Sequence, residues 1–276
     1  MPEIETKNEM AKELKGLNLF HFGMSNCSQR ARLALEEKGL KWTSHHLDMM
    51  NDEHATPEYH SINPNGVVPT LVHDGRTIIE SLDIIAYADD IGDGPSLTPD
   101  DPALATQMQD LFDLADKAQP AVKLLSHEFL FKPARKMNQK QLDEMRRGHS
   151  NKALIDFLEE FSAGFSRERI AKDVQFFCDA CDTLEASLTK SGGPWLLGEQ
   201  FSLADLAWIV NLHRVKLMRW DFRKWPRLMT WIKAMEARPA YDAALRAWEP
   251  RGVLAAFGIY TRVKGLFGGG VNSYRT

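Results

Sequence analysis

The sequence predicts an α/β domain in its N-terminal third, followed by an all-helical domain. Up to residue 91, short apolar segments alternate with turn residues, a pattern typical of strands and helices that share one sheet. Residues 92–102 (GDGPSLTPDDP) hold three prolines and two glycines and predict a linker. Beyond this linker the apolar residues recur at the helical period, without a convincing strand pattern. We therefore expect an N-terminal extension over residues 1–16 and a first domain over residues 17–91. The linker, residues 92–102, then leads to a helical domain over residues 103–250 and a glycine-rich tail over residues 251–276.

The composition is that of an ordinary globular protein, with 276 residues, a net charge of −4 and a pI of about 6.2. No basic field argues for a nucleic-acid partner. The cysteines are Cys27, Cys178 and Cys181. Because their number is odd and two of them are close together, we expect no disulfide framework and a reducing compartment, the cytoplasm. Residues 1–15 lack the apolar core of a signal peptide, and no uncharged run in the tail is long enough to span a bilayer.

The first domain reads as strand, helix, strand, strand, strand, helix, an order that fits a thioredoxin-like sheet. The first strand ends at Gly23, and the apolar stripe of the following helix ends at Gly39. His73–Arg76 predicts a hairpin turn between the last two strands. The expected strands are Leu17–Phe22, Lys41–Met49, Thr70–Val72 and Thr77–Ile79, and Glu80–Ser81 opens a helix over Leu82–Asp90.

The second domain is predicted as helices of different character. Ala103–Phe131 is expected to be mostly helical and bent at Pro120. Lys132–Ser166 is polar and heavily charged, which indicates a mobile or helical excursion. Further helices are expected over Arg167–Thr189, from Phe201–Asp205 to about Met218, over Arg227–Glu236, and up to about Trp248.

The turn between the first strand and the first helix carries the clearest chemical signal. Met24-Ser25-Asn26-Cys27-Ser28 places a hydroxyl and a thiol two residues apart at a helix N-terminus. Such a position is a ready anion site and favours a thiolate over a thiol. We therefore interpret this turn as a site that handles a thiol, either its own or that of a bound molecule.

Three features together resemble the glutathione transferase family over about Leu17–Trp248. They are the Ser/Cys turn, Val68-Pro69 followed by Glu80-Ser81, and Ser202-Leu203-Ala204-Asp205 in the helical half. The last is also a physical device, because Asp205 can reach back to the Ser202 N–H in an Asp variant of the capping box. The sequence is similar to bacterial tetrachlorohydroquinone dehalogenases, to bacterial β-aryl etherases and to ganglioside-induced differentiation-associated proteins.

The resemblance implies glutathione as co-substrate, with Ser25 donating to its thiolate. Cys27 would be a second nucleophile that attacks a glutathione conjugate. The simpler readings are that Ser25 only caps its helix and that Cys27 is a small residue facing the core. Ser28 is a competing donor, and Asn26 a weaker one.

The resemblance also implies how the tripeptide is held. The backbone of Val68 would pair with its cysteinyl part, with Pro69 shaping the loop in a cis peptide. Glu80 and Ser81 would hold the γ-glutamyl end, although Ser81 could also serve only as a cap. His54 matches the family's residue near the glycine carboxylate, or is a plain loop histidine.

These features predict a glutathione transferase that attacks a small aromatic electrophile with loss of halide or aryloxide, as in lignin or haloaromatic degradation. A homodimer or a heterodimer with a related chain is expected, and no metal, because Cys178 and Cys181 have no further ligands at suitable spacing. The alternative is a non-catalytic protein of the differentiation-associated type that binds partners through Lys132–Arg147 or the tail. The identity of the second substrate is not predicted.

Overall fold

The computed structural model describes residues 3–49, 51–135, 138–148 and 151–275. Contacts group the chain into two compact units. Unit 1 comprises Met1–Ser96, Gln139–Asp156 and Asp242–Trp248, and unit 2 comprises Leu97–Asn138, Phe157–Tyr241 and Glu249–Thr276. Two segments from the second half of the sequence therefore belong to the sheet-bearing unit, because packing is not bound to follow chain order.

In the described residues, unit 1 is built on a five-stranded sheet with the order β1-β5-β4-β2-β3. β2 and β3 are parallel, and the other neighbouring pairs are antiparallel. The expected strands are present with slightly different ends, and β1 in the N-terminal extension was not expected. The bounds are β1 Glu3–Ile4, β2 Leu17–His21, β3 Trp42–His46, β4 Thr70–His73 and β5 Arg76–Ile78.

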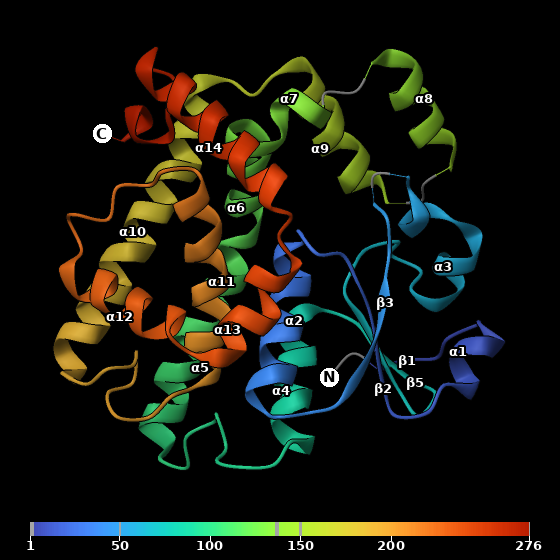
Figure 1. Cartoon of the computed structure of the whole chain (residues 1–276), viewed down its shortest axis with the longest axis horizontal. Helices are drawn as coiled ribbons and strands as arrows, with labels where there is room; N and C mark the ends of the chain where they lie inside the picture. The colour runs from blue at the N-terminus through green and yellow to red at the C-terminus, as the bar shows by residue number, and fades with distance from the viewer. Residues whose placement is uncertain (1–2, 50, 136–137, 149–150, 276) are drawn as a thin grey trace. The chain divides into compact units, whose positions relative to one another are not determined.

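Helices cover both faces of this sheet. α2 and α4 pack against each other on one side, and α1 and α3 lie on the other (Figure 1). A cluster of buried apolar side chains fills the space under α3, including Phe20, Tyr59, Ile62, Val68 and Val72. The bounds are α1 Glu9–Glu13, α2 Asn26–Glu37, the 3₁₀ helix η1 Glu53–Ala55, α3 Pro57–Ile62 and α4 Ser81–Ile91.

Unit 2 is built mainly of helices in its described residues, as predicted, with two isolated β-bridges between residues 195 and 200. The expected break at Pro120 separates α5 (Pro102–Lys117) from α6 (Gln119–Ser126), because proline fits only the first turn of a helix. A single π-helical segment, η2 (His127–Phe131), continues α6. Asp205 reaches back to the Ser202 N–H at 3.0 Å, which confirms the predicted contact. The remaining main helices of unit 2 are α10 Arg167–Ser191, α11 Leu203–Leu217 and α12 Pro226–Glu236. They are followed by α13 Pro239–Ala244 and the 3₁₀ helix η3 Arg246–Trp248. Part of α13 and all of η3 belong to unit 1.

The charged excursion is helical where the structure describes it. α7 (Lys132–Arg135), α8 (Gln139–Gly148) and α9 (Lys152–Ala163) cover it, and residues 136–137 and 149–150 lie outside the described residues.

The glycine-rich tail forms a helix that sequence patterns did not predict. α14 spans Arg251–Leu266, and the 3₁₀ helix η4 spans Val271–Tyr274. The glycines are tolerated because the inner face of α14 buries Phe257 and Thr261 against unit 2. No helix among the described residues is both long and apolar enough to pass through a lipid bilayer.

Candidate functional site

The strand register of unit 1 brings the predicted binding turns to one end of the strands β2, β4 and β5, which we call the sheet edge. In the antiparallel pair β2–β4, Phe20 lies opposite Thr70, so the turn after β2 lies beside the loop before β4. In the pair β4–β5, Leu71 lies opposite Ile78, so the residues that follow β5 reach the same edge. Three stretches that are distant in sequence therefore meet there: Ser25–Cys27, Val68–Pro69 and Glu80–Ser81.

Ser25 is the residue that caps the start of α2. Its half-buried hydroxyl accepts a hydrogen bond from the Ser28 N–H at 3.3 Å. This bond leaves the hydroxyl proton for an acceptor at the positive end of the helix dipole. Ser28, the competing donor, is fully buried, and its hydroxyl accepts from the Phe22 N–H at 3.3 Å. Ser25 is therefore the more accessible of the two hydroxyls.

Asn26 and Cys27 are the first two residues of α2, and both are half-buried. Cys27 is a free thiol in the turn that Ser25 caps. Cys178 and Cys181 differ from it, because they are buried in α10, where burial raises the pKa of both thiols. Of the three thiols, Cys27 is the least buried.

Arg32 and His21 fix the backbone of this turn, although sequence patterns did not single them out. The buried Arg32 guanidinium donates to the carbonyl oxygens of Gly23 and Phe22 at 2.8 and 3.3 Å and contacts His21 Nδ1 at 3.0 Å. Arginine can only donate, so Nδ1 accepts, and the His21 proton lies on Nε2, 2.8 Å from Ser44 Oγ. Burial and the neighbouring cation lower the pKa of His21 to about 3, which keeps the ring neutral.

The segment Asp242–Trp248 packs against the same turn within unit 1. Arg32 Nε donates to the carbonyl oxygen of Ala244 at 2.8 Å, a contact between residues 212 positions apart. The Trp248 ring stacks on His46 with centroids 6.0 Å apart and planes 8° apart. A Cβ at Gly23 would lie 2.7 Å from the Trp248 carbonyl oxygen, so only glycine fits there. No local sequence signal could have found this contact.

The Val68–Pro69 peptide is cis, as predicted. Two buried side chains hold the loop before it, since the Tyr59 hydroxyl and the Asn63 amide donate to the Val67 carbonyl at 2.7 and 2.9 Å. Among the described residues, no hydrogen bond engages the backbone N–H or C=O of Val68. An open donor and acceptor at a sheet edge can pair with an extended peptide.

Glu80 precedes α4 in an unusual backbone conformation, with φ at 68°. Its side chain is exposed, and Ser81 directly after it is buried in the first turn of α4. A carboxylate that attracts an ammonium group thus lies beside a helix N-terminus that attracts a carboxylate. An α-amino acid carries both groups, and backbone strain at such a position indicates function.

His54 lies in η1 with only 5% of its surface exposed. Its predicted contact with a glycine carboxylate therefore stays a prediction. Within the described ranges, no cluster of three or more His, Cys, Asp or Glu side chains could hold a metal ion.

Comparisons with known proteins identify the family to which the chain is similar. Family models for the N-terminal and C-terminal domains of glutathione S-transferases match residues 24–91 and 170–234. Glutathione S-transferase 1 of Dianthus caryophyllus is 30% identical, over 71% of this chain and 76% of its own. The tetrachloro-p-hydroquinone reductive dehalogenase of Sphingobium chlorophenolicum is 27% identical, over 83% of this chain and 95% of its own. The crystal structure of the β-etherase LigF from Sphingobium sp. strain SYK-6 has a TM-score of 0.75 at 26% identity, covering 83% of this chain and 98% of that one.

The chain belongs to the glutathione S-transferase family. The predicted fold class, a thioredoxin-like domain with an all-helical domain, is confirmed. The predicted resemblance to dehalogenases and β-aryl etherases is confirmed as well. As a family member the protein is an enzyme, and glutathione is its co-substrate.

Proposed function

We propose that the sheet edge in unit 1 binds glutathione and holds its sulfur as a thiolate beside Ser25. The position of Ser25 carries this proposal, because its hydroxyl caps α2 and keeps its proton for an acceptor at the helix N-terminus. The glutathione thiol is mostly protonated at neutral pH. A donor and a helix dipole directed at the sulfur favour the nucleophilic form.

The other residues at this edge hold the rest of the tripeptide. The Glu80 carboxylate receives the amino group of the γ-glutamyl end, and the Ser81 hydroxyl with the N-terminus of α4 receives its carboxylate. The open backbone of Val68 pairs with the cysteinyl part, and Pro69 sets the direction of this peptide. Asn26 lines the turn beside the sulfur, and His54 serves the glycine carboxylate.

The second substrate is an aromatic electrophile that carries a halide or aryloxide leaving group. Reductive dehalogenation and ether cleavage are the reactions for which the Sphingobium chlorophenolicum dehalogenase and the β-etherase LigF are named, which supports this choice. The thiolate attacks carbon and forms a carbon–sulfur bond, while the leaving group departs with the electron pair of the broken bond. The product of this step is a glutathione thioether.

Cys27 adds a second, reductive step. Its thiolate attacks the sulfur of the thioether and forms a mixed disulfide, while the carbon leaves with the electron pair and takes a proton from solvent. A second glutathione thiolate then attacks the mixed disulfide, which restores Cys27 and releases glutathione disulfide. Replacement of one halide by hydrogen thus oxidises two glutathione molecules.

The experiment compares Ser25→Ala, Cys27→Ser and the control Ser28→Ala on a panel of chlorinated hydroquinones and β-aryl ethers. We expect Ser25→Ala to lower turnover on all substrates by about 10²- to 10³-fold, the typical loss of one donor to a developing anion. Cys27→Ser should accumulate the glutathione thioether, identified by mass spectrometry, while the other variants do not. Unchanged rates in both Ser25→Ala and Cys27→Ser would remove both roles.

None of the comparisons described above favours the alternative expected from sequence, a non-catalytic protein that binds partners, which would have a different signature. It would be retained on a glutathione column and stabilised by glutathione, without turnover on any member of the panel. The relatives described above are named for enzymatic activities, which supports the catalytic reading.

We also infer a cytoplasmic dimer of identical or related chains. The family resemblance supports the dimer, and the three free cysteines support a reducing compartment. Light scattering on the purified protein tests the first point, and fractionation of the source cells tests the second.

A further inference from the structure

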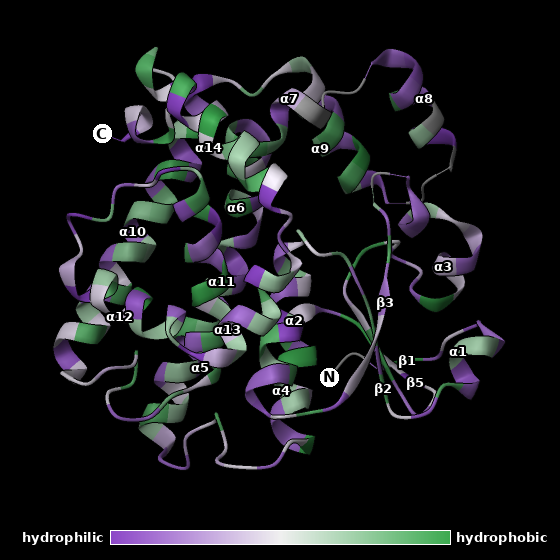
Figure 2. Cartoon of the chain, viewed as in Figure 1, coloured by the Kyte–Doolittle hydropathy of each residue, from purple (hydrophilic) through white to green (hydrophobic). Residues whose placement is uncertain are grey.

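The outer face of α14 in unit 2 carries an exposed apolar stripe. Residues three or four positions apart share one face of a helix, and here Ala255, Ile259, Val263 and Leu266 do so. Ile259 is 67% exposed, Leu266 79%, and the adjacent Phe267 87%. These are most of the large apolar side chains that the described chain leaves in solvent, and Figure 2 colours much of α14 as apolar. A contiguous apolar surface of this kind marks a binding face.

The inner face of the same helix is fixed to unit 2, so the outer stripe is not simply a loose segment. Phe257 is buried and contacts Phe131 with ring centroids 5.6 Å apart. Lys264 forms an ion pair with the buried carboxylate of Glu128 and also donates to its carbonyl oxygen at 3.1 Å. The charge of Lys264 is therefore neutralised inside the protein and is not part of the outer face.

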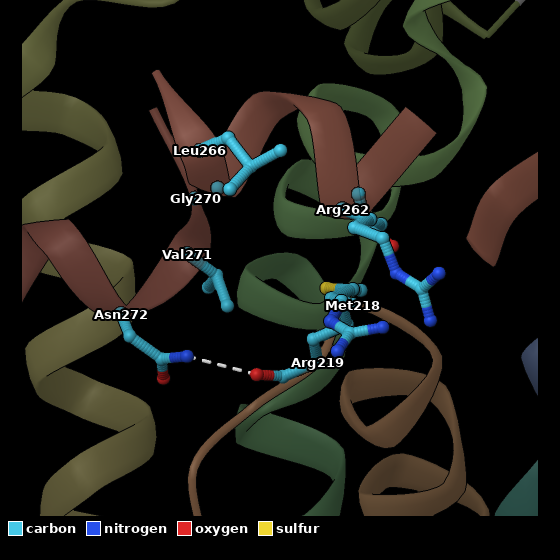
Figure 3. Close-up of a pocket in the computed structure, with 9 residues that line it drawn as sticks. Met218, Arg219, Arg262, Leu266, Gly270, Val271 and Asn272 are labelled. Carbon is cyan, nitrogen blue, oxygen red and sulfur yellow. Dashed lines mark hydrogen bonds between the residues drawn. The ribbon is translucent and has the colours of Figure 1, made fainter. Parts of the chain in front are cut away.

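Arg262 is an exposed cation on this helix. Residues 251–276 contain no acidic residue, in a chain whose net charge is −4. Of their other basic residues, Arg251 is exposed, whereas Lys264 is paired with Glu128 and Arg275 is half-buried over the Trp220 ring. Arg219, two residues after the end of α11, lines two pockets beside α14 together with Arg262. Figure 3 shows both arginine side chains on the same side of the first pocket. Within the described residues, neither guanidinium has a carboxylate partner.

Arg219 is held in place by its backbone. Its φ is 65°, and its carbonyl oxygen accepts a hydrogen bond from the Asn272 amide at 2.8 Å. The second pocket is otherwise lined by small and apolar residues, namely Ala255, Gly258, Ile259 and Val263. Two exposed arginines therefore border an open apolar furrow.

We propose that this face of α14 docks on an anionic phospholipid surface. The arginines would meet the phosphate and carboxylate groups of the lipids, and the apolar stripe with Leu266 and Phe267 would enter the boundary between headgroups and acyl chains. The 16-residue helix is too short to cross the bilayer and lies along its surface.

Charge and shape favour a membrane over the other occupants. A symmetric contact with a second copy would place the arginines of one α14 against those of the other, with no acidic residue in the segment to neutralise them. A free phosphate would satisfy Arg219 and Arg262 but would leave the apolar stripe in water. A lipid surface satisfies both.

The test measures co-sedimentation of the full-length chain with vesicles of phosphatidylcholine and phosphatidylserine at a ratio of about 3:1, and with phosphatidylcholine alone. We expect binding to the anionic vesicles only, and weaker binding as salt rises. Arg219→Asn with Arg262→Gln should weaken the partition by about 30-fold, from roughly one kcal/mol per charge. Asparagine is chosen at Arg219 because it tolerates a positive φ. Leu266→Ser with Phe267→Ser should abolish binding.

Two variants serve as matched controls. Lys15→Gln with Lys41→Gln removes two exposed cations elsewhere, and Met10→Ser removes an exposed apolar side chain from α1. Both should bind vesicles as the wild type does, and circular dichroism should show all variants folded.

Four results would overturn the proposal. The first is no binding to anionic vesicles at low salt, and the second is an equal loss of binding in the control variants. The third is conversion of a dimer to a monomer by Leu266→Ser with Phe267→Ser, which would make this face an interface between copies. The fourth is stabilisation by millimolar inorganic phosphate that depends on Arg219 and Arg262, which would assign the site to a soluble anion.

Discussion

The Arg32 guanidinium donates to the carbonyl oxygen of Gly23 across 2.8 Å, and this bond ties α2 to the turn that leads into it. Both residues are buried, so the bond lies away from water. The turn that presents Ser25 is thereby held from behind by a side chain of the helix that Ser25 caps. The catalytic geometry that we propose depends on this support.

We expect Arg32→Met to destabilise unit 1 by about 3 kcal/mol or more. The substitution leaves the carbonyl oxygens of Phe22, Gly23 and Ala244 buried without this donor, and each such group costs about 1–3 kcal/mol. Urea unfolding of the variant gives the free energy directly. The control is Arg76→Met, whose partner Glu3 is exposed, and which should cost far less than Arg32→Met because water screens exposed ion pairs. Equal losses in the two variants would contradict this role for Arg32.

The stability of the protein should fall as the pH is lowered through the range below 6.5, in part because of His21. The pKa of His21 is lowered to about 3 in the folded protein, while the unfolded chain takes up a proton near pH 6.5. The stabilisation is therefore complete above pH 6.5 and is lost as the pH falls toward 3, with a loss of roughly 2 kcal/mol at pH 5. Urea unfolding at pH 7.5 and 5.0 measures it.

The matched variant for this prediction is His21→Asn. Burial also lowers the pKa of His45, which adds a loss in the same direction. The contribution of His21 is thus the difference between wild type and variant in their change from pH 7.5 to 5.0. The same change in both proteins would show that His21 does not titrate as proposed.

Only one of the three cysteines should react with an alkylating agent in the native state. Cys27 is half-buried, whereas Cys178 and Cys181 are buried, and burial raises the pKa of both. Mass spectrometry after brief treatment with iodoacetamide should find the label on Cys27, and saturating glutathione should slow this reaction if the proposed site is correct. Labelling of Cys178 or Cys181 at a comparable rate, with the protein folded, would refute the prediction.

Replacement of Glu80 by glycine should separate stability from binding. Glycine adopts a φ of 68° without strain, so Glu80→Gly should stabilise the fold by about 1 kcal/mol. The same change removes the carboxylate proposed to hold the glutathione amino group, so the KM for glutathione should rise. Thermal unfolding and steady-state kinetics measure the two effects. A destabilised variant with an unchanged KM would contradict both parts. The control is Glu58→Gly, which replaces an exposed glutamate inside a helix, where φ is ordinary.

Asp205→Ala should be among the most damaging substitutions in unit 2, with a loss of about 3 kcal/mol or more, because each buried donor left without an acceptor costs about 1–3 kcal/mol. The buried carboxylate accepts from the backbone N–H groups of Leu196 and Ser202, the Ser202 hydroxyl and the Trp231 indole, at 2.7–3.0 Å. Thermal unfolding should place Asp205→Asn between the wild type and Asp205→Ala, because an amide retains one acceptor oxygen. If Asp205→Ala unfolds like the exposed control Asp113→Ala, this network does not stabilise the unit.

Much of the architecture could be predicted from local patterns. The strands, the Pro120 break and the contact of Asp205 with Ser202 depend on neighbours within a few residues, where periodicity, turn chemistry and capping act. The tail helix α14 was not predicted, because six glycines lower the helix propensity of residues 252–270. Burial of Phe257 and Thr261 outweighs that propensity, and burial is a tertiary effect.

The sequence by itself determined the order of strands and helices, the turn with Ser25 and Cys27, and the cis peptide before Pro69. Each of these features depends on residues that are adjacent in the chain. Only the tertiary structure decided that Arg32, Ala244 and Trp248 support that turn, and that the cations and apolar residues of α14 share one open surface. The physical reason is that contacts between residues up to 212 positions apart depend on how whole elements pack, and no local pattern records that packing.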